Sequence, residues 1–242
     1  MASDNFPDRL ARSYALRVGE KPVFRPAIQE ERRDALLDIA ETMMAEKGIL
    51  QTGLQEIGAR IGLPPYAVRA QYGSRDMVIE AVIDRHLDRL IDRLGDWEQF
   101  NTDPDPAQRL RQAIRHLLDM LYAYRHGQGV HVAAMSGASP HLNRLLKLRQ
   151  RHLAHYYAGL IAAAVPETQG ETELAMPIAM NLMAMACWHV LWFRDRGALD
   201  RAALSALLFH MVTAGAQAAI AEGIGAWESP LPPGEAGAGG TG

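Results

Sequence analysis

Cysteine is nearly absent from this chain of 242 residues, in which Cys187 is the only one. A single cysteine excludes an internal disulfide and a cysteine-based zinc cage, as expected in a reducing compartment. No segment approaches the roughly 18 uninterrupted apolar residues of a membrane-spanning helix. The first residues, MASDNFPDRLARS, also lack the apolar region of a secretory signal. We therefore expect a soluble, cytoplasmic protein that does not engage a membrane.

An excess of positive charge is missing too. The chain has 25 Lys and Arg against 28 Asp and Glu, which gives a net charge of −3 and a pI near 6.3. These values argue against a protein coated with basic residues that binds nucleic acid without specificity. They remain compatible with a local basic patch.

Catalytic motifs are also absent. The chain has no phosphate-cradling glycine loop, no HExxH and no GxSxG. His152 and His155 lie three residues apart, but no carboxylate or third histidine is spaced to complete a metal site. Cys187 lies in an apolar segment without neighbouring cations, which is typical of a core residue rather than a redox sensor. We predict no enzyme activity, no catalytic or metal-binding residues and no cofactor.

The most informative stretch that the chain does contain is LQEIGARIGLPPYAVRAQYG, residues 54–73. Its first half has the spacing of one buried helix face and ends at Gly62. Pro64 forces the residue before it out of the helical conformation, and Pro65 suits the first position of a second helix. Two short helices joined by a tight turn form a helix-turn-helix, whose second helix enters the DNA major groove. The residues of the first face are Leu54, Ile57, Gly58 and Ile61.

The flanking segments make this assignment more specific. They read RRDALLDIAETMMAEKGILQTGLQEIG upstream and QYGSRDMVIEAVIDRHL downstream. In order, a glycine ends a first helix, a threonine precedes the second, an aromatic residue closes the third and a Ser-basic-acidic sequence opens the fourth. This ordered set, over residues 29–89, resembles the TetR family of bacterial repressors. The resemblance implies a homodimeric repressor that binds a pseudo-palindromic double-stranded DNA operator and releases it when a small-molecule effector binds.

The resemblance also implies an all-α fold of about nine helices. A three-helix helix-turn-helix module would precede a larger helical domain for effector binding and dimerisation. We divide the chain into an N-terminal arm (1–27), a DNA-binding domain (28–76), the helical domain (77–227) and a tail of disordered composition (228–242). The arm carries five basic residues and either contacts DNA or is a solvated tail. Outside the motif, helices are expected at 28–47, from Ser74 to a boundary at 95–106, and at 107–125, 130–136, 141–165, 171 or 177 to 194 and 200–226, with Gly127 and Gly129 as helix breakers.

The resemblance places the DNA contacts around the motif. Where this chain has Gly53, Pro64, Tyr66, Arg69 and Gln71, family members usually carry serine or threonine, serine, glycine, tyrosine and histidine. These departures predict an uncommon operator and keep open an alternative, a helical interaction protein of the same fold that has lost sequence-specific DNA binding. The hydroxyl of Thr52 is expected to cap the second helix or to meet a phosphate. The candidate DNA-binding residues are Thr52, Gly53, Pro65, Tyr66, Ala67, Arg69, Ala70, Gln71, Tyr72 and Arg75.

In this family a small-molecule pocket lies in the second domain, so the resemblance also suggests effector-binding residues. Most are apolar, which predicts a mostly apolar effector, and plain core packing is the alternative for each of them. The last two long helices are rich in small and apolar residues, and we expect them to form a four-helix interface between two copies, with an intrachain core as the alternative. The candidate effector residues are Leu117, Leu121, Tyr122, His126, His131, Met135, Tyr156, Met180, Asn181, Ala184 and Trp188.

Overall fold

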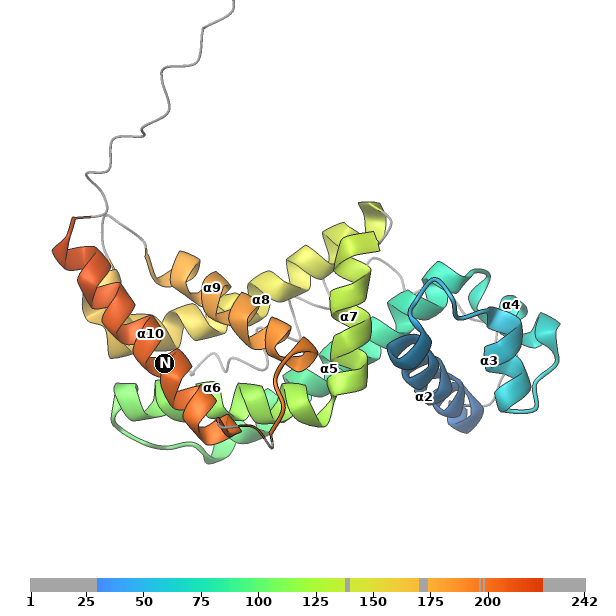
Figure 1. The fold of residues 1–242 in the computed structure, drawn as a ribbon, viewed down its shortest axis with the longest axis horizontal. Coiled ribbons are helices and arrows are strands. Elements are labelled where there is room, and N and C mark those ends of the chain that lie inside the picture. The colour runs from blue at the N-terminus through green and yellow to red at the C-terminus, as the bar shows by residue number, and fades with distance from the viewer. Residues whose placement is uncertain (1–29, 138–139, 170–173, 196, 198, 224–242) are drawn as a thin grey trace, which may run out of the picture.

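The computed structural model describes residues 30–137, 140–169, 174–195, 197 and 199–223. Within these ranges the chain forms nine α-helices, α2 to α10, with two short 3-10 turns and no strand (Figure 1). The predicted all-α fold is therefore confirmed. The N-terminal arm and the tail beyond residue 227 lie outside the described residues.

The first three helices form a small module at one end of the molecule. They are α2 (Glu30–Lys47), α3 (Leu54–Arg60) and α4 (Pro65–Tyr72). Gly48 ends α2 with a φ of +95°, a left-handed conformation that favours glycine. The helices α3 and α4 cross closely, because a Cβ on Gly58 would lie 2.9 Å from Cγ2 of Val68. These features agree with the helix-turn-helix prediction.

A single long helix, α5 (Arg75–Phe100), leaves this module and runs into the larger part of the molecule. Its start follows the prediction, since the hydroxyl of Ser74 accepts a hydrogen bond from the amide of Met77 at 3.2 Å. Its end does not. We expected a boundary from residue 95, but Leu94 and Gly95 are buried inside the helix, which continues to Phe100. Packing against the rest of the domain thus extends the helix through a glycine.

The larger part contains five further helices. Gly127 and Gly129 were expected to break the chain, but both lie within α7, and the interruption falls at Tyr124. The helix tolerates them because its amides remain paired, for example Gln128 N–H with the Tyr124 carbonyl at 3.0 Å. The elements are α6 (Pro106–Ala123), α7 (Arg125–Gly137), α8 (Pro140–Ala164), η1 (Pro166–Thr168), α9 (Ala175–Trp188), η2 (His189–Leu191) and α10 (Arg201–Ala221).

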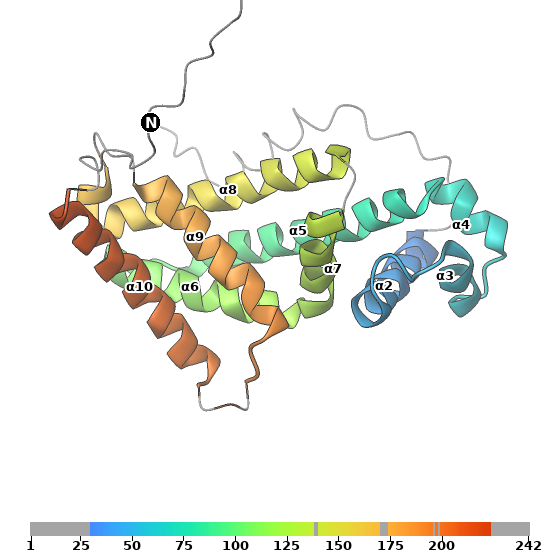
Figure 2. The same ribbon diagram turned by 45° about the horizontal axis from the view of Figure 1, so that its top comes forward.

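Different helices form the two ends of the molecule. The helices α9 and α10 lie at the end away from α3 and α4, with α9 against α8 and α10 against α6 (Figure 1). Between the ends, α7 lies beside α5 and also packs against α2 (Figure 2). The helix α7 therefore touches both the small module and the helix that leaves it.

Candidate functional site

The outer surface of α4 presents the side chains that were expected to meet DNA. Tyr66 is 74% exposed, and Arg69 and Ala70 are also exposed. Tyr66 and Arg69 border a shallow hollow on the surface together with Gly53 and Arg75. No ion pair joins Arg69 to another residue in the part of the chain that the structure describes. Its guanidinium is therefore free to meet a phosphate or a base edge.

Three of the ten candidate DNA contacts are instead buried, namely Thr52, Gln71 and Tyr72, each at most 5% exposed. The hydroxyl of Thr52 donates to the Gly48 carbonyl at 2.9 Å, and α3 has Gly53 as its N-cap with no side-chain bond. The expected helix cap is therefore wrong. Thr52 closes the loop after α2, and its burial keeps its hydroxyl away from any phosphate.

Two of the other buried or half-buried polar candidates, Tyr72 and Arg75, also brace the module. Burial raises the pKa of Tyr72, and a hydrogen bond with Arg33 partly opposes this shift. Arg75 donates from Nη1 to the carbonyl of Leu50 at 2.8 Å, which fixes the loop that precedes α3. Ala67 is half-buried, and Pro65 occupies the first turn of α4 as predicted.

The small module is fastened to α5 by a group of charges. Arg85 and Arg89 of α5 both reach Oε2 of Glu41 on α2, at 3.1 and 3.3 Å. Both arginines also pair with Asp38 one turn earlier in α2, at 2.8 and 3.3 Å. Glu41 is buried, so its two partners screen it from solvent. A movement of α5 must therefore carry α2 with it.

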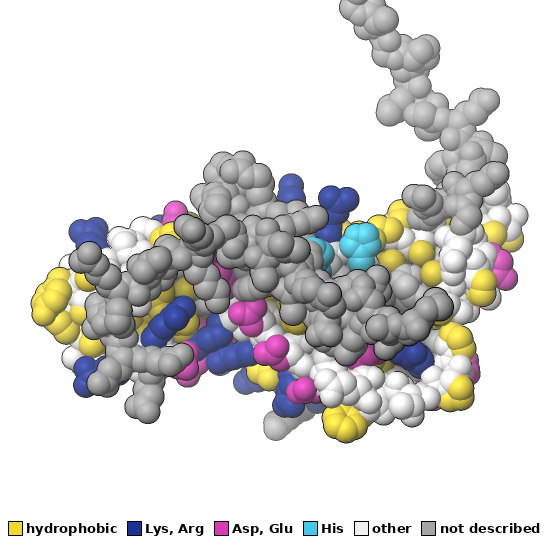
Figure 3. Space-filling model, turned by 180° about the vertical axis from the view of Figure 1, so that it is seen from behind, with side chains coloured by type: hydrophobic (Ala, Val, Ile, Leu, Met, Phe, Trp, Pro, Cys, Tyr) yellow, Lys and Arg dark blue, Asp and Glu magenta, His cyan; other side chains and the backbone are white. Residues whose placement is uncertain are grey.

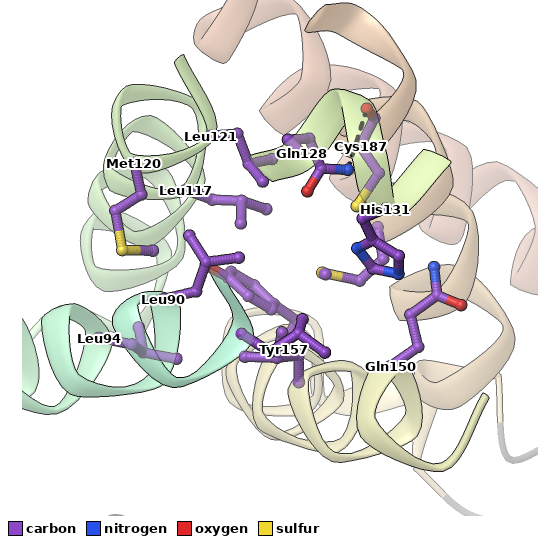
Figure 4. A pocket seen from close by; sticks show the side chains of 13 residues that line it. Leu90, Leu94, Leu117, Met120, Leu121, Gln128, His131, Gln150, Tyr157 and Cys187 are labelled. Carbon is purple, nitrogen blue, oxygen red and sulfur yellow. Dashed lines mark hydrogen bonds between the residues drawn. The ribbon is translucent and has the colours of Figure 1, made fainter. Parts of the chain in front are cut away.

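A closed cavity lies further along the molecule, surrounded by five helices (Figure 4). Its volume is about 10 Å³, roughly the room of one water molecule. No Asp, Glu, Lys or Arg is among the described residues that face it. The lining comprises Leu87, Leu90 and Leu94 of α5; Leu117, Met120 and Leu121 of α6; Gln128 and His131 of α7; Gln150, Leu153 and Tyr157 of α8; and Met183 and Cys187 of α9.

Of the eleven candidate effector residues, the structure brings three together at this cavity: Leu117, Leu121 and His131. Tyr156 is buried, but its hydroxyl donates to the carboxylate of Glu98. The candidates on α9 lie on its exposed face, whereas Met183 and Cys187 of the same helix face the cavity. The candidates that do not line the cavity are Tyr122, His126, Met135, Tyr156, Met180, Asn181, Ala184 and Trp188.

A buried polar group closes one side of the cavity. His86 of α5 shares a hydrogen bond of 3.0 Å between Nε2 and Oε1 of Gln128, whose amide donates to the Cys187 carbonyl at 3.4 Å. Gln128 was not predicted, because it lies in a polar stretch, RHGQGVH, that gives no apolar signal. The ring of His131 lies beside that of His86, with centroids 6.1 Å apart.

Burial makes this group electrically neutral. It lowers the pKa of His131 to about 4, with the neighbouring His86 as a smaller cause, and it lowers the pKa of His86 as well. Burial also raises the pKa of the Cys187 thiol to about 11, so the thiolate needed for redox chemistry is disfavoured. The described lining of the cavity therefore offers hydrogen bonds and apolar contacts but no charge.

Known proteins similar to this chain are DNA-binding regulators. A sequence model of the tetracyclin repressor-like C-terminal domain matches residues 103–216. The HTH-type transcriptional activator FasR of Mycolicibacterium smegmatis is 30% identical over 93 residues, 38% of this chain and 42% of FasR. The HTH-type transcriptional repressor KstR2 of the same organism is 21% identical over 182 residues, 72% of this chain and 85% of KstR2. The chain thus spans less than half of FasR and most of KstR2.

Solved structures share the fold. A TetR-family transcriptional regulator from Bordetella parapertussis aligns with a TM-score of 0.65 at 20% identity, over 76% of this chain and 95% of that one. AibR, solved in complex with isovaleryl coenzyme A and operator DNA, aligns with a TM-score of 0.63 at 15% identity, over 74% of this chain and 97% of that one. These findings show that residues 103–216 match a tetracyclin repressor-like C-terminal domain and that the chain, with its helix-turn-helix of α3 and α4, has the fold of TetR-family transcriptional regulators.

Proposed function

We propose that this regulator is a cytoplasmic repressor that binds a pseudo-palindromic operator as a homodimer and is released by a mostly apolar effector. The role of α5 carries the proposal. Arg85 and Arg89 fasten this helix to α2, and Leu87, Leu90 and Leu94 of the same helix line the cavity. The same helix therefore meets both the DNA-reading module and the candidate effector.

The size of the cavity supports release on binding. Any effector larger than a water molecule must separate the helices around the cavity, α5 among them. Such a ligand binds the widened arrangement better than the closed one and so shifts the population towards it. In a dimer, tilting α5 changes the distance between the two α4 helices, which then no longer match successive major grooves.

The effector's apolar character is supported by the described lining, in which six of the thirteen residues are leucine. The complex of AibR with isovaleryl coenzyme A and operator DNA is a precedent for a protein of this fold that binds both an acyl compound and DNA. The names of FasR and KstR2 include an activator and a repressor. We favour repression because a ligand that spreads the reading heads weakens operator binding.

The homodimer is supported by apolar side chains that α9, η2 and α10 leave uncovered. Trp188 is 55% exposed, and α10 is long and apolar enough to cross a membrane by length and composition alone, with 33% of that apolar window buried. A second copy that covers these faces would remove them from water, as in a self-complementary interface. The exposed residues are Met180, Trp188, Leu191, Trp192, Leu207 and Met211.

DNA recognition is assigned chiefly to Tyr66 and Arg69, the large side chains that α4 exposes. Seen from behind relative to Figure 1, the molecule carries both acidic and basic side chains (Figure 3), which agrees with binding through a local surface rather than a basic coat. Selection from random duplexes should yield a two-fold symmetric site. The substitutions Arg69→Ala and Tyr66→Ala should each weaken binding to it by about tenfold without loss of helicity.

The salt dependence of operator binding distinguishes a direct contact of Arg69 with DNA from the effect of the protein's overall charge. Arg69→Ala should reduce the slope of log K against log salt by about one. Arg151→Ala, which removes an exposed arginine of α8, is the matched control and should leave both affinity and slope unchanged. If no duplex is preferred at low salt, the alternative of a helical interaction protein that has lost DNA recognition replaces this proposal.

A further inference from the structure

Among the described residues that line the cavity, one buried polar side chain has unused hydrogen-bonding groups. His131 is 2% exposed, and neither of its ring nitrogens has a partner among the described residues. The other buried polar groups of the lining are occupied. Gln128 bonds His86 and the Cys187 carbonyl, and the hydroxyl of Tyr157 donates to the Ala113 carbonyl at 3.3 Å.

An unpaired buried imidazole is costly, because folding removes it from water without replacing its hydrogen bonds. Apolar packing alone would be served equally well by a leucine at this position. In Figure 4 the ring of His131 lies at the edge of the open space, on the same side as the amide of Gln150. The imidazole is thus placed where a group entering the cavity would meet it.

The lining also limits the charge of that group. Among the side chains that the structure describes, none with a full charge faces the cavity, and burial keeps the imidazole neutral, since the pKa of His131 falls to about 4. A carboxylate or a phosphate in this space would find no cation to offset its desolvation. A neutral imidazole instead offers one N–H donor and one lone pair.

We propose that the cavity takes the apolar part of an effector that carries a neutral carbonyl or hydroxyl group, and that His131 recognises this group by a hydrogen bond. The proposal rests on the proposed effector site and specifies its chemistry. A charged part of the effector, if it has one, must remain outside the leucine-lined space. His131 then determines specificity, because it distinguishes an oxygenated chain from a plain hydrocarbon of the same shape.

The test uses four probes with the same eight-carbon chain: octan-2-one, octan-1-ol, octanoate and octane. Binding to the full-length protein at pH 7.5 is measured by calorimetry and by the rise in melting temperature. The ketone and the alcohol should bind about tenfold more tightly than octanoate or octane, the usual value of one well-formed hydrogen bond.

The matched variants are His131→Leu and His126→Leu, both on α7, of which only the first changes the cavity. His131→Leu should fold, because it removes an unpaired polar group, and should lose the preference for ketone over octane. His126→Leu should keep it. The inference is overturned if His131→Leu binds the ketone as the wild type does, if octanoate binds most tightly, or if neither neutral oxygenated probe binds.

Operator release is measured separately, so that the two proposals fail differently. If the ketone binds through His131 but leaves the selected operator bound, the inference stands and ligand-controlled repression falls. If the ketone releases the operator equally from wild type and from His131→Leu, repression stands and the inference falls.

Discussion

Gly127 of α7 lies so close to His86 of α5 that a Cβ on the glycine would be 2.7 Å from Nδ1 of the histidine ring. The next residue, Gln128, holds the same ring by its hydrogen bond at Nε2. Because α7 also packs against α2 and lines the cavity through His131, this contact joins the cavity, the linking helix and the DNA-binding module. The two helices α5 and α7 can approach this closely because Gly127 has no side chain.

The substitution Gly127→Ala should therefore force the His86 ring or the whole of α7 to move. We expect a loss of about 1–3 kcal/mol in the free energy of unfolding, the usual cost of overpacking. Urea denaturation measures it. Gly129→Ala, on the same helix, is the control, because its Cβ would enter open space. There alanine should stabilise by roughly 0.5–1 kcal/mol through its better helix propensity. Equal effects at both positions would contradict the close-contact argument.

Glu41 gives a second prediction, because it is the buried carboxylate between Arg85 and Arg89. Glu41→Gln should leave Arg85 and Arg89 with Asp38 as their remaining carboxylate in α2, at a cost of about 1–3 kcal/mol. Hydrogen exchange should quicken chiefly in α2 to α4, which lose part of their fastening to α5. Glu56→Gln is the control. It breaks a pair with Lys47 in which both side chains are about two-fifths exposed, and such pairs contribute at most about 1 kcal/mol. Uniform exchange through the chain would contradict a local fastening.

The features predicted well from sequence are those fixed by neighbouring residues. The end of the first helix at a glycine, the start of α4 at Pro65 and the helix starts near Ser74 and residue 200 all depend on the chemistry of a few adjacent positions. The side chains of Ser74 and Asp200 accept hydrogen bonds from the amides of Met77 and Ala203 and so cap these two helices. Thr52 differs because its hydroxyl could have bonded the backbone of the following helix or that of the preceding loop. The conformation of the loop, which the local sequence does not specify, decides between these partners.

The inward face of α9 could not be read from its sequence, AMPIAMNLMAMACW. A helix that is apolar on nearly all sides has no periodic signal that says which side faces the core. Met180 and Met183 are chemically alike, yet only Met183 reaches the cavity, because α8 covers that side. His126 and His131 pose the same problem on α7, where contact with α5 buries one and leaves the other exposed. Long-range packing, absent from any local pattern, makes both choices.

The exposed face of α10 allows a direct test of dimerisation. Leu207 is 48% exposed, so Leu207→Glu adds a charge to a solvent-facing helix position and should leave the single chain folded. In a four-helix interface the same charge would be buried without a partner, and the dimer should dissociate. Sedimentation equilibrium should show a monomer, with operator affinity reduced. Ala133→Glu, on the exposed face of α7, is the control and should remain dimeric. A dimeric Leu207→Glu protein would place the interface elsewhere.

The neutral His131 makes a prediction about pH. In the unfolded chain its pKa returns to the ordinary 6.5, whereas in the folded protein burial lowers the pKa to about 4. The unfolded state therefore binds the proton first. Stability is greatest above pH 6.5 and falls as the pH drops from 6.5 towards 4, by up to roughly 3 kcal/mol for this group. His86, whose pKa is also lowered by burial, acts in the same direction.

The substitution His131→Leu should remove this group's share of the pH dependence. The variant should already be more stable at pH 8, by about 1–3 kcal/mol, because no buried nitrogen is left unpaired. Its advantage over the wild type should widen as the pH falls to 5, and denaturant titrations at several pH values measure the difference. His126→Leu, which changes an exposed ring of the same helix, should follow the wild type throughout. A constant difference between His131→Leu and the wild type would contradict this prediction. It would mean that His131 takes up a proton as readily in the folded protein as in the unfolded chain, despite its burial against the leucines of the cavity.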